Sequence, residues 1–398
     1  MDRTHNQVRQ ITNDMTGIKA SDYYDFSLLA VVVVLMGFGL IMLYSTTAYT
    51  SKISLGNDME FFRKQGLIDL GCMVMAIVIS RLELKQLRVF IIPVYIISIC
   101  MMFLVLVPGL RYYSHGAYRW IRIGPVNFQP SEAAKIAVIL MLSECVMRMG
   151  TRIGEIRNVG RLILIGAVPA LIAWRVTNNL STALIIMAIT AVMIFLAHPK
   201  TLVFILIACA AALAVWLFIH TISTSLTSSD NFRIQRILTW LHPEEYADGE
   251  GYQTMQALYA IGSGGFFGRG FGNSIQKLGS IPEAQNDMIF SIVCEELGIF
   301  GAIILLSLFG YMLYRMEFIA RHARDAFDFM LVSGVFIHIS LQVILNIAVV
   351  LNLMPNTGVT LPFISYGGTS IVFLMGEIGL VLNVSRHIRY QDVNQALL

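Results

Sequence analysis

Long apolar runs separated by short polar segments dominate this chain between residues 26 and 384. A helix needs about 20 mostly apolar residues to cross a bilayer. Seven runs are clear candidates, and three shorter ones (66–80, 133–146 and 162–174) cross when their flanking residues are included. The pattern therefore predicts an all-α integral membrane protein with about ten transmembrane helices: Phe26–Ser45, Gly66–Ser80, Phe90–Leu110, Ala133–Val146, Leu162–Trp174, Leu180–Ala197, Thr201–Ile219, Leu297–Tyr314, Phe329–Leu351 and Ser370–Val384.

Composition agrees with this class of protein. Only 13% of the 398 residues are charged and the mean hydropathy is +0.70, whereas soluble domains carry roughly a quarter charged residues. The net charge of +3 gives no reason to expect a nucleic-acid partner. The five cysteines lie in apolar runs without metal-ligand spacing, which is typical of small core residues.

The distribution of lysine and arginine predicts how the chain is oriented. Ten spans place both termini on one side, and the six segments on that side hold 16 of the 28 basic residues. Basic residues favour the cytoplasm. We therefore expect cytoplasmic tails at 1–25 and 385–398, a membrane domain at 26–384, and a large extracytoplasmic loop, Thr221–Glu296, between the seventh and eighth spans.

The first outer segment of chemical interest is "YRWIRIGPVNFQPSEAAK", Tyr118–Lys135. Arg119 and Arg122 flank Trp120, and "QPSE" is typical of a helix start, with proline early and an acid in the first turn. An interfacial anchor explains Trp120 and Arg122 equally well. Glu132 and Lys135 are the better candidates for a site, because charges inside a helix bundle are costly and usually functional.

Two further outer segments are irregular. The large loop contains "NFRIQRILTWLHP", an amphipathic helix with Arg233 and Arg236 on one face, and the glycine-rich "GSGGFFGRGFG". The glycine run lacks the context of a nucleotide site, and a close backbone approach to a ligand or a helix suffices to explain it. The segment Asn352–Ser370 has two prolines and three glycines, which at this depth indicates a cavity wall.

An acidic cluster completes the candidate site. "SIPEAQNDMIFSIVCEELG" (280–298) holds Glu283, Asp287, Glu295 and Glu296. The candidate cavity combines the cations Arg119, Lys135 and Arg233 with the acids Glu132, Glu283 and Asp287. This suits an amphiphile with an anionic head group: the cations would hold phosphate, and a carboxylate with a raised pKa could accept a proton.

These motifs carry a resemblance to a known family. "GAYRWIRIGPVNFQPSEAAK", "GYQTMQALYAIGSGGFFGRGFGNSIQKLG", "IPEAQNDMIFSIVCEELG" and "PNTGVTLPFISYGGTS" resemble the SEDS proteins (shape, elongation, division and sporulation), which include FtsW, RodA and SpoVE. The resemblance covers nearly the whole chain, and "PEAQND" is similar to the FtsW and SpoVE version. "VTNNLSTA" (176–183) departs from the family, which commonly has a proline–aspartate pair there.

The resemblance implies a peptidoglycan glycosyltransferase that polymerises lipid II on the outer face of the bacterial cytoplasmic membrane, with Asp287 as the catalytic base. A division role is expected, with elongation or spore cortex synthesis as alternatives. Its expected partners are lipid II, a class B penicillin-binding protein, other divisome proteins and membrane lipid. No cofactor is certain, and a divalent cation such as Mg²⁺ or Mn²⁺ is left open. Glu295 and Glu296 are expected to orient the loop. The expected substrate-binding residues are Arg119, Trp120, Gln129, Glu132, Lys135, Arg233, Gln253, Glu283, Ser365, Tyr366 and Gly367.

Two rival functions remain open. A lipid II flippase or transporter would also use broken helices and charges in the membrane, although the halves show no internal repeat and the charges cluster on the outer side. An inactive scaffold for a penicillin-binding protein would need only a contact face, which does not account for the dense polar motifs.

Overall fold

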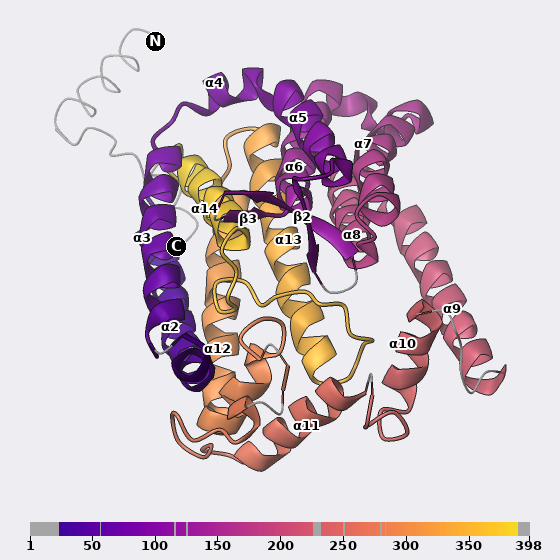
Figure 1. The fold of residues 1–398 in the computed structure, drawn as a ribbon. Helices are drawn as coiled ribbons and strands as arrows, with labels where there is room; N and C mark the ends of the chain where they lie inside the picture. The colour runs from indigo at the N-terminus through magenta and orange to yellow at the C-terminus, as the bar shows by residue number, and fades with distance from the viewer. Residues whose placement is uncertain are drawn as a thin grey trace, which may run out of the picture.

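The computed structural model describes residues 24–55, 57–114, 117–124, 126–225, 232–249, 251–278, 281–282 and 284–388. Its helices are α2 (Phe26–Leu55), α3 (Glu60–Ser80), α4 (Leu84–Val89), α5 (Ile91–Phe103), α6 (Pro130–Met149), α7 (Ile156–Arg175), α8 (Leu180–Ala197), α9 (Thr201–Ser225), α10 (Phe232–Leu241), α11 (Tyr252–Gly264), α12 (Ile289–Arg321), α13 (Ala326–Val350) and α14 (Ser370–Ser385). Three short 3₁₀ turns are η1 (Leu104–Leu106), η2 (Gly150–Gly154) and η3 (Gln276–Leu278). The strands are β1 (Arg111–Ser114), β2 (Ala117–Ile123) and β3 (Val126–Phe128). Figure 1 shows the helices gathered into one bundle.

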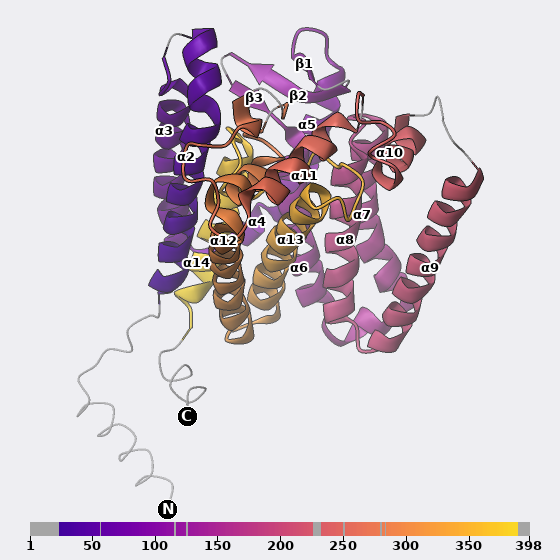
Figure 2. The ribbon, with the colours of Figure 1, turned by 90° about the horizontal axis from the view of Figure 1, so that it is seen from below.

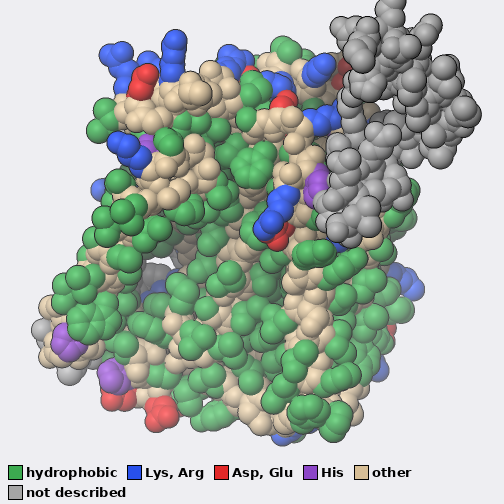
Figure 3. All heavy atoms as spheres, turned by 180° about the vertical axis from the view of Figure 1, so that it is seen from behind, with side chains coloured by type: hydrophobic (Ala, Val, Ile, Leu, Met, Phe, Trp, Pro, Cys, Tyr) green, Lys and Arg blue, Asp and Glu red, His purple; other side chains and the backbone are tan. Residues whose placement is uncertain are grey.

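The helices confirm a multi-pass membrane protein. Each predicted span coincides with a helix, and α2, α7, α8, α9, α12 and α13 are long and apolar enough to cross a membrane. Shorter apolar helices cover Ile91–Leu106 and Ser370–Ser385. Hydrophobic side chains cover most of the face drawn in Figure 3, while charged ones gather toward its edges. The remaining two predicted spans, α3 and α6, bury charged side chains, and the total of ten stays a prediction.

The bundle has two different ends. In Figure 2, α2 begins and α14 ends at one end, while the sheet, α10 and α11 lie across the other. Helix α13 packs against α6, α8, α12 and α14, and α14 packs closely on α3. The segments with dense polar motifs therefore meet at the end that is opposite the termini.

A small sheet precedes α6 and adds to the predicted all-α architecture. The segment expected to be an interfacial anchor forms β2, the middle strand of an antiparallel sheet in the order β1-β2-β3. Its alternating Tyr, Trp and Ile residues fit a pleated, half-buried strand better than a helix. Beyond β3, Gln129 is the N-cap of α6 and Pro130 its first residue, which confirms the predicted helix start.

Helices extend into both ends of the predicted large loop, Thr221–Glu296. Helix α9 extends to Ser225 and α12 begins at Ile289, so Glu295 and Glu296 lie inside a helix, ahead of the predicted span that starts at Leu297. An apolar pattern cannot detect this extension, because two adjacent acids normally mark the end of a span. Between these helices the chain forms α10, α11 and η3.

Candidate active site

Asp287 lies in the turn that leads into α12, and a buried asparagine fixes its backbone. Asn346 of α13 is 1% exposed, and its side-chain nitrogen donates to the carbonyl oxygens of Asp287 (2.7 Å) and Val359 (2.8 Å). Asp287 itself is half-buried. One side chain on a rigid helix therefore holds the candidate base and the segment after α13 together.

The segment between α13 and α14 forms the wall opposite Asp287. The Tyr366 amide donates to the Gln285 carbonyl at 2.9 Å, which joins the two motifs directly. Gly358 has a φ of 66°, and a Cβ on it would lie 4.0 Å from Oδ2 of Asp287. The carboxylate of Asp287 thus faces irregular backbone, as the proline and glycine content of this segment predicts.

Gln253 of α11 connects the large loop to both segments. Its side-chain nitrogen donates to the Pro282 carbonyl (3.3 Å), and its oxygen accepts from the Asn356 side chain (3.1 Å). Helix α10 adds a second connection, because NH1 of Arg236 donates to the Asn356 carbonyl at 3.2 Å. The outer loop is therefore packed onto the same wall as Asp287.

Arg119 supplies positive charge from the sheet. Its NH2 donates to the Asn178 carbonyl at 3.2 Å, and its Nε is buried without a partner among the described residues. Burial lowers the pKa of Arg119, and the nearby positive charge of Arg236 lowers it further. Two guanidinium groups this close together are typical of a site for an anion. Trp120, next along β2, is half-buried.

Glu132 and Lys135 form a buried ion pair one turn into α6. Lys135 Nζ lies 2.9 Å from Glu132 Oε1, and the residues are 1% and 7% exposed. The second carboxylate oxygen of Glu132 is buried without a partner among the described residues. A pair this deep stabilises a fold weakly at best, since desolvation cancels most of the attraction. Both residues stay predicted substrate-binding residues.

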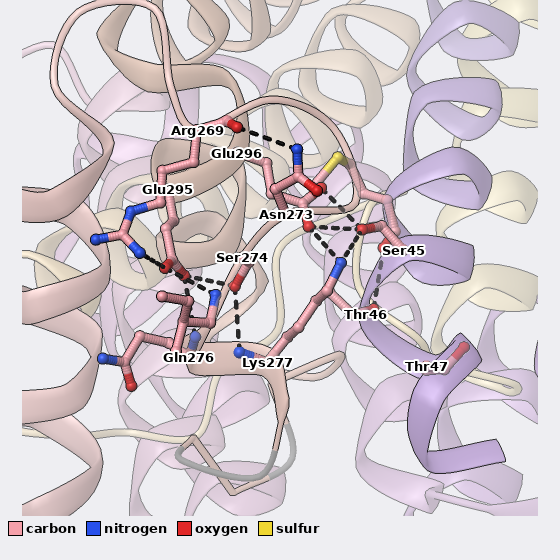
Figure 4. Close-up of polar contacts among 12 residues, drawn as sticks. Ser45, Thr46, Thr47, Arg269, Asn273, Ser274, Gln276, Lys277, Glu295 and Glu296 are labelled. Atoms are coloured by element: carbon pink, nitrogen blue, oxygen red, sulfur yellow. Dashed lines mark hydrogen bonds and ion pairs between the residues drawn. The ribbon is translucent and has the colours of Figure 1, made fainter. Parts of the chain in front are cut away.

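The other two acids of the cluster hold structure together (Figure 4). Glu295 accepts from the Ser274 hydroxyl (2.5 Å) and the Ile275 amide (3.0 Å). Glu296 accepts from Ser45 of α2 (2.7 Å) and pairs with Lys277 Nζ at 2.7 Å. Both glutamates are fully buried. They tie α12 to α2 and to the loop before η3, which confirms the prediction that they orient the loop.

The glycine-rich run wraps a break in α12. Gly298 departs from helical geometry with φ 69° and ψ −166°, which frees backbone groups around it. The amides of Arg269 and Gly270 donate to the carbonyls of Glu295 (2.9 Å) and Glu296 (3.0 Å). A Cβ on Gly268 would lie 2.1 Å from the Glu296 oxygen, so only glycine fits there. Of the two explanations left open by the sequence, approach to a helix is the correct one.

Several predicted site residues have local roles in the structure. The Gln129 side chain donates to the Ser131 hydroxyl (3.1 Å), and the Ser365 hydroxyl accepts from the Leu361 amide (2.8 Å). The Gly367 carbonyl accepts from the Ser370 hydroxyl (3.4 Å). These hydrogen bonds stabilise the local backbone, and the substrate-binding role of Gln129, Ser365 and Gly367 stays a prediction. Glu283 and the side chain of Arg233 lie outside the described residues.

The departure at "VTNNLSTA" has a structural explanation. Asn179 caps α8, accepting from the Thr182 amide at 3.1 Å, and asparagine and aspartate cap helices about equally well. Asn178 has a φ of 49°, which proline cannot adopt, and its carbonyl receives Arg119. The segment therefore keeps a helix cap, and its backbone meets Arg119 at Asn178.

Sequence reasoning missed Asn346, Asn356 and the pair Ser45–Lys277 that neutralises Glu296. The sequence could have indicated Asn346, because it is a lone amide in the apolar run "VILNIAVV" and polar groups at that depth are usually paired or functional. Ser45 and Lys277 had none, because they are 232 positions apart and meet only in the folded chain.

The described residues show no metal centre. They contain no group of three or more His, Cys, Asp or Glu side chains placed to hold a metal ion. A divalent cation such as Mg²⁺ or Mn²⁺ stays a prediction.

Comparison with known proteins gives the family. Residues 26–390 match the cell cycle proteins FtsW, RodA and SpoVE, so the chain belongs to this family. It is 36% identical to stage V sporulation protein E of Bacillus subtilis (92% of this chain, 98% of that one). It is 34% identical to a probable peptidoglycan glycosyltransferase FtsW of Trichlorobacter lovleyi (91% and 93%).

Solved structures of similar fold agree with this family membership. A chain of a peptidoglycan synthase complex that coordinates polymerization and crosslinking superposes with a TM-score of 0.75 at 27% identity, covering 93% of this chain and 99% of that chain. The rod shape determining protein RodA of Thermus thermophilus superposes with a TM-score of 0.64 at 26% identity (93% and 98%). The family predicted from the motifs is therefore confirmed.

Proposed function

We propose that this protein is a peptidoglycan glycosyltransferase that polymerises lipid II on the outer face of the cytoplasmic membrane, with Asp287 as general base. The observation that carries the proposal is the position of Asp287: Asn346 holds its backbone carbonyl, and its carboxylate faces Gly358 in the segment after α13. The names of the relatives support the enzyme class.

The proposed step is a direct displacement. The 4-hydroxyl of the acceptor's terminal GlcNAc attacks the anomeric carbon of the donor's MurNAc, and Asp287 takes the hydroxyl proton. The bond between the anomeric carbon and the pyrophosphate oxygen breaks, and undecaprenyl pyrophosphate leaves as an anion. Inversion of the α-linked donor to a β-linkage needs one base and no covalent intermediate. Lys135 and Arg119 are the cations proposed to stabilise the leaving group.

The cellular setting belongs to the same proposal. Both termini are cytoplasmic, and a class B penicillin-binding protein cross-links the strands. The similarity to a peptidoglycan synthase complex supports such a partner. Division is the favoured role, in company with other divisome proteins, and elongation and spore cortex synthesis are the alternatives.

The test is polymerisation of labelled lipid II by purified protein in detergent. Asp287→Asn keeps the shape of the side chain but cannot accept the proton, so the rate should fall by about 10²- to 10⁴-fold. Asp248→Asn, an exposed change in the same loop, is the control and should leave the rate unchanged. Cognate penicillin-binding protein is added in a parallel reaction.

Strong polymerisation by contamination-free Asp287→Asn protein would remove Asp287 from the mechanism. Wild-type protein that moves lipid II across vesicles without polymerising it would establish the flippase alternative. Wild-type protein that does neither but binds its penicillin-binding protein would establish the scaffold.

A further inference from the structure

A polar pocket opens between α10, α11 and the segment that follows α13. Its lining combines the guanidinium of Arg236, the indole of Trp240, the hydroxyls of Thr239 and Thr254 and three amide side chains, around a cavity volume of about 150 Å³. The described lining residues include no acid. The pocket therefore suits a ligand that is rich in hydrogen-bond acceptors and carries negative charge.

A second guanidinium group lies near Arg236. Arg236 lies close enough to Arg119 for its charge to lower the pKa of Arg119. Each guanidinium group donates a hydrogen bond to a backbone carbonyl, Arg236 to that of Asn356 and Arg119 to that of Asn178.

A buried hydroxyl also points to a ligand. Thr239 is 6% exposed, lines the pocket, and has a hydroxyl without a partner among the described residues. Leaving a buried hydroxyl unsatisfied is unfavourable, and native structures seldom do so. A ligand acceptor in the pocket would satisfy it.

The pocket shares a wall with the candidate base. Gln253 and Asn356 line it, and the Asn356 side-chain oxygen accepts from the Gly358 amide at 3.0 Å. Gly358 in turn faces the carboxylate of Asp287. A ligand in the pocket can therefore belong to the same substrate molecule whose sugar lies at Asp287.

The position of the pocket indicates which part of lipid II it could bind. Helices α10 and α11 lie across the end of the bundle, beyond the long apolar helices (Figure 2). The pyrophosphate of lipid II is attached directly to the lipid tail, whereas the stem peptide extends from the sugar into water. Carboxylates accept two hydrogen bonds from a guanidinium, and peptide amides pair with amide side chains.

We propose that this pocket binds the carboxylate-bearing stem peptide of the substrate, with Arg236 on a carboxylate and Thr239 on a peptide carbonyl. The proposal rests on the proposed function and adds a subsite to it. It predicts that Arg236 and Thr239 determine recognition of the peptide and leave the chemical step to Asp287.

The experiment compares two substrates in the detergent assay. One is lipid II, and the other is an analogue whose stem peptide is replaced by a neutral methylamide. Arg236→Gln should raise the apparent KM for lipid II about tenfold with kcat within twofold, and should leave the KM for the analogue unchanged. Thr239→Val should act in the same direction by about threefold. Arg122→Gln, an exposed arginine on β2, is the matched control and should change neither KM.

Turnover of the analogue by each variant shows that the variant is folded. An equal rise in KM for both substrates would overturn the proposal and assign Arg236 to the pyrophosphate or to the fold, and Arg236→Lys would separate these two by restoring charge. Unchanged KM for both substrates would also overturn it while the proposed function stands. Wild-type protein that polymerises neither substrate would defeat the proposed function and this subsite with it.

Discussion

Asn346 is the residue on which the position of Asp287 depends most directly. It is buried in α13, and its side-chain nitrogen donates hydrogen bonds to two carbonyls of the site, those of Asp287 and Val359. Its own side-chain oxygen has no partner among the described residues. A polar group kept at this cost in an apolar helix is expected to fix geometry, because a small displacement of a catalytic group slows a reaction strongly.

We predict that Asn346→Ala lowers kcat for lipid II polymerisation by about 10- to 100-fold. Asn383→Ala is the matched control, because Asn383 also donates to two carbonyls, those of Ile79 (2.7 Å) and Leu82 (2.6 Å), far from the site. Both variants should lose thermal stability in detergent. Equal kcat values in the two folded variants would contradict the positioning role.

The ion pair Glu132–Lys135 gives a second prediction at this scale. Lys135→Met leaves a buried carboxylate without its partner, which costs about 3–5 kcal/mol. The double variant Glu132→Gln/Lys135→Met removes both charges and should recover most of that stability in thermal unfolding. If Lys135 holds pyrophosphate, the double variant should still use lipid II poorly. Full recovery of activity would instead assign the pair to the fold.

At the scale of elements, the break in α12 decides how the site is supported. Glu295 and Glu296 precede the break at Gly298, and the glycine-rich loop covers the backbone groups that it exposes. Ser45 and Lys277 then tie this broken end to α2 and η3. The start of α12, which follows the turn that carries Asp287, is therefore anchored both by the glycine-rich loop and by α2 and η3.

We predict that Gly298→Ala destabilises the protein by more than about 2 kcal/mol. A Cβ at Gly298 would lie 2.4 Å from both the Gly268 nitrogen and the Phe266 oxygen, in a conformation that disfavours alanine. Gly310→Ala in the same helix has nothing within 4 Å and should change stability by less than about 1 kcal/mol. Similar melting temperatures for the two variants would show that the break is not a structural requirement.

For the whole molecule, orientation follows from the two ends of the bundle. The sheet, α10 and α11 lie at one end, opposite the start of α2 and the end of α14 (Figure 2). The turn that carries Asp287 is joined to α11 through the hydrogen bond from Gln253 to the Pro282 carbonyl. Basic residues concentrate in the segments at the end of the termini. The proposed function requires that the Asp287 end face outward, where the positive-inside rule also places it.

We predict that an impermeant maleimide labels intact cells at Asp248→Cys and not at Lys200→Cys. Both positions are exposed, one at each end of the bundle, and the five native cysteines are first replaced by serine. Permeabilised cells should label at both positions, which controls for reactivity. The reverse pattern in intact cells would place Asp287 in the cytoplasm and rule out the proposed site of polymerisation.

The sequence by itself determined the membrane class, the helices and the family. An apolar run is a property of neighbouring residues, and each predicted span coincides with a helix. The motifs around Asp287, Glu132 and Lys135 are also contiguous in the chain, so they could be recognised directly. The sheet at 111–128 escaped the hydropathy pattern, because short strands with Tyr, Trp and Arg resemble an interfacial anchor in composition.

Only the tertiary structure decided which polar residues belong together. Glu295 and Glu296 were expected to orient the loop, but their partners came only from the fold: Ser274 donates to Glu295, Ser45 donates to Glu296, and Lys277 pairs with Glu296. Asn346 and Gln253 became site residues because their partners lie on other segments. The physical reason is that hydrogen bonds and charge pairs depend on distance in space, and in a helix bundle residues far apart in the chain come within bonding distance.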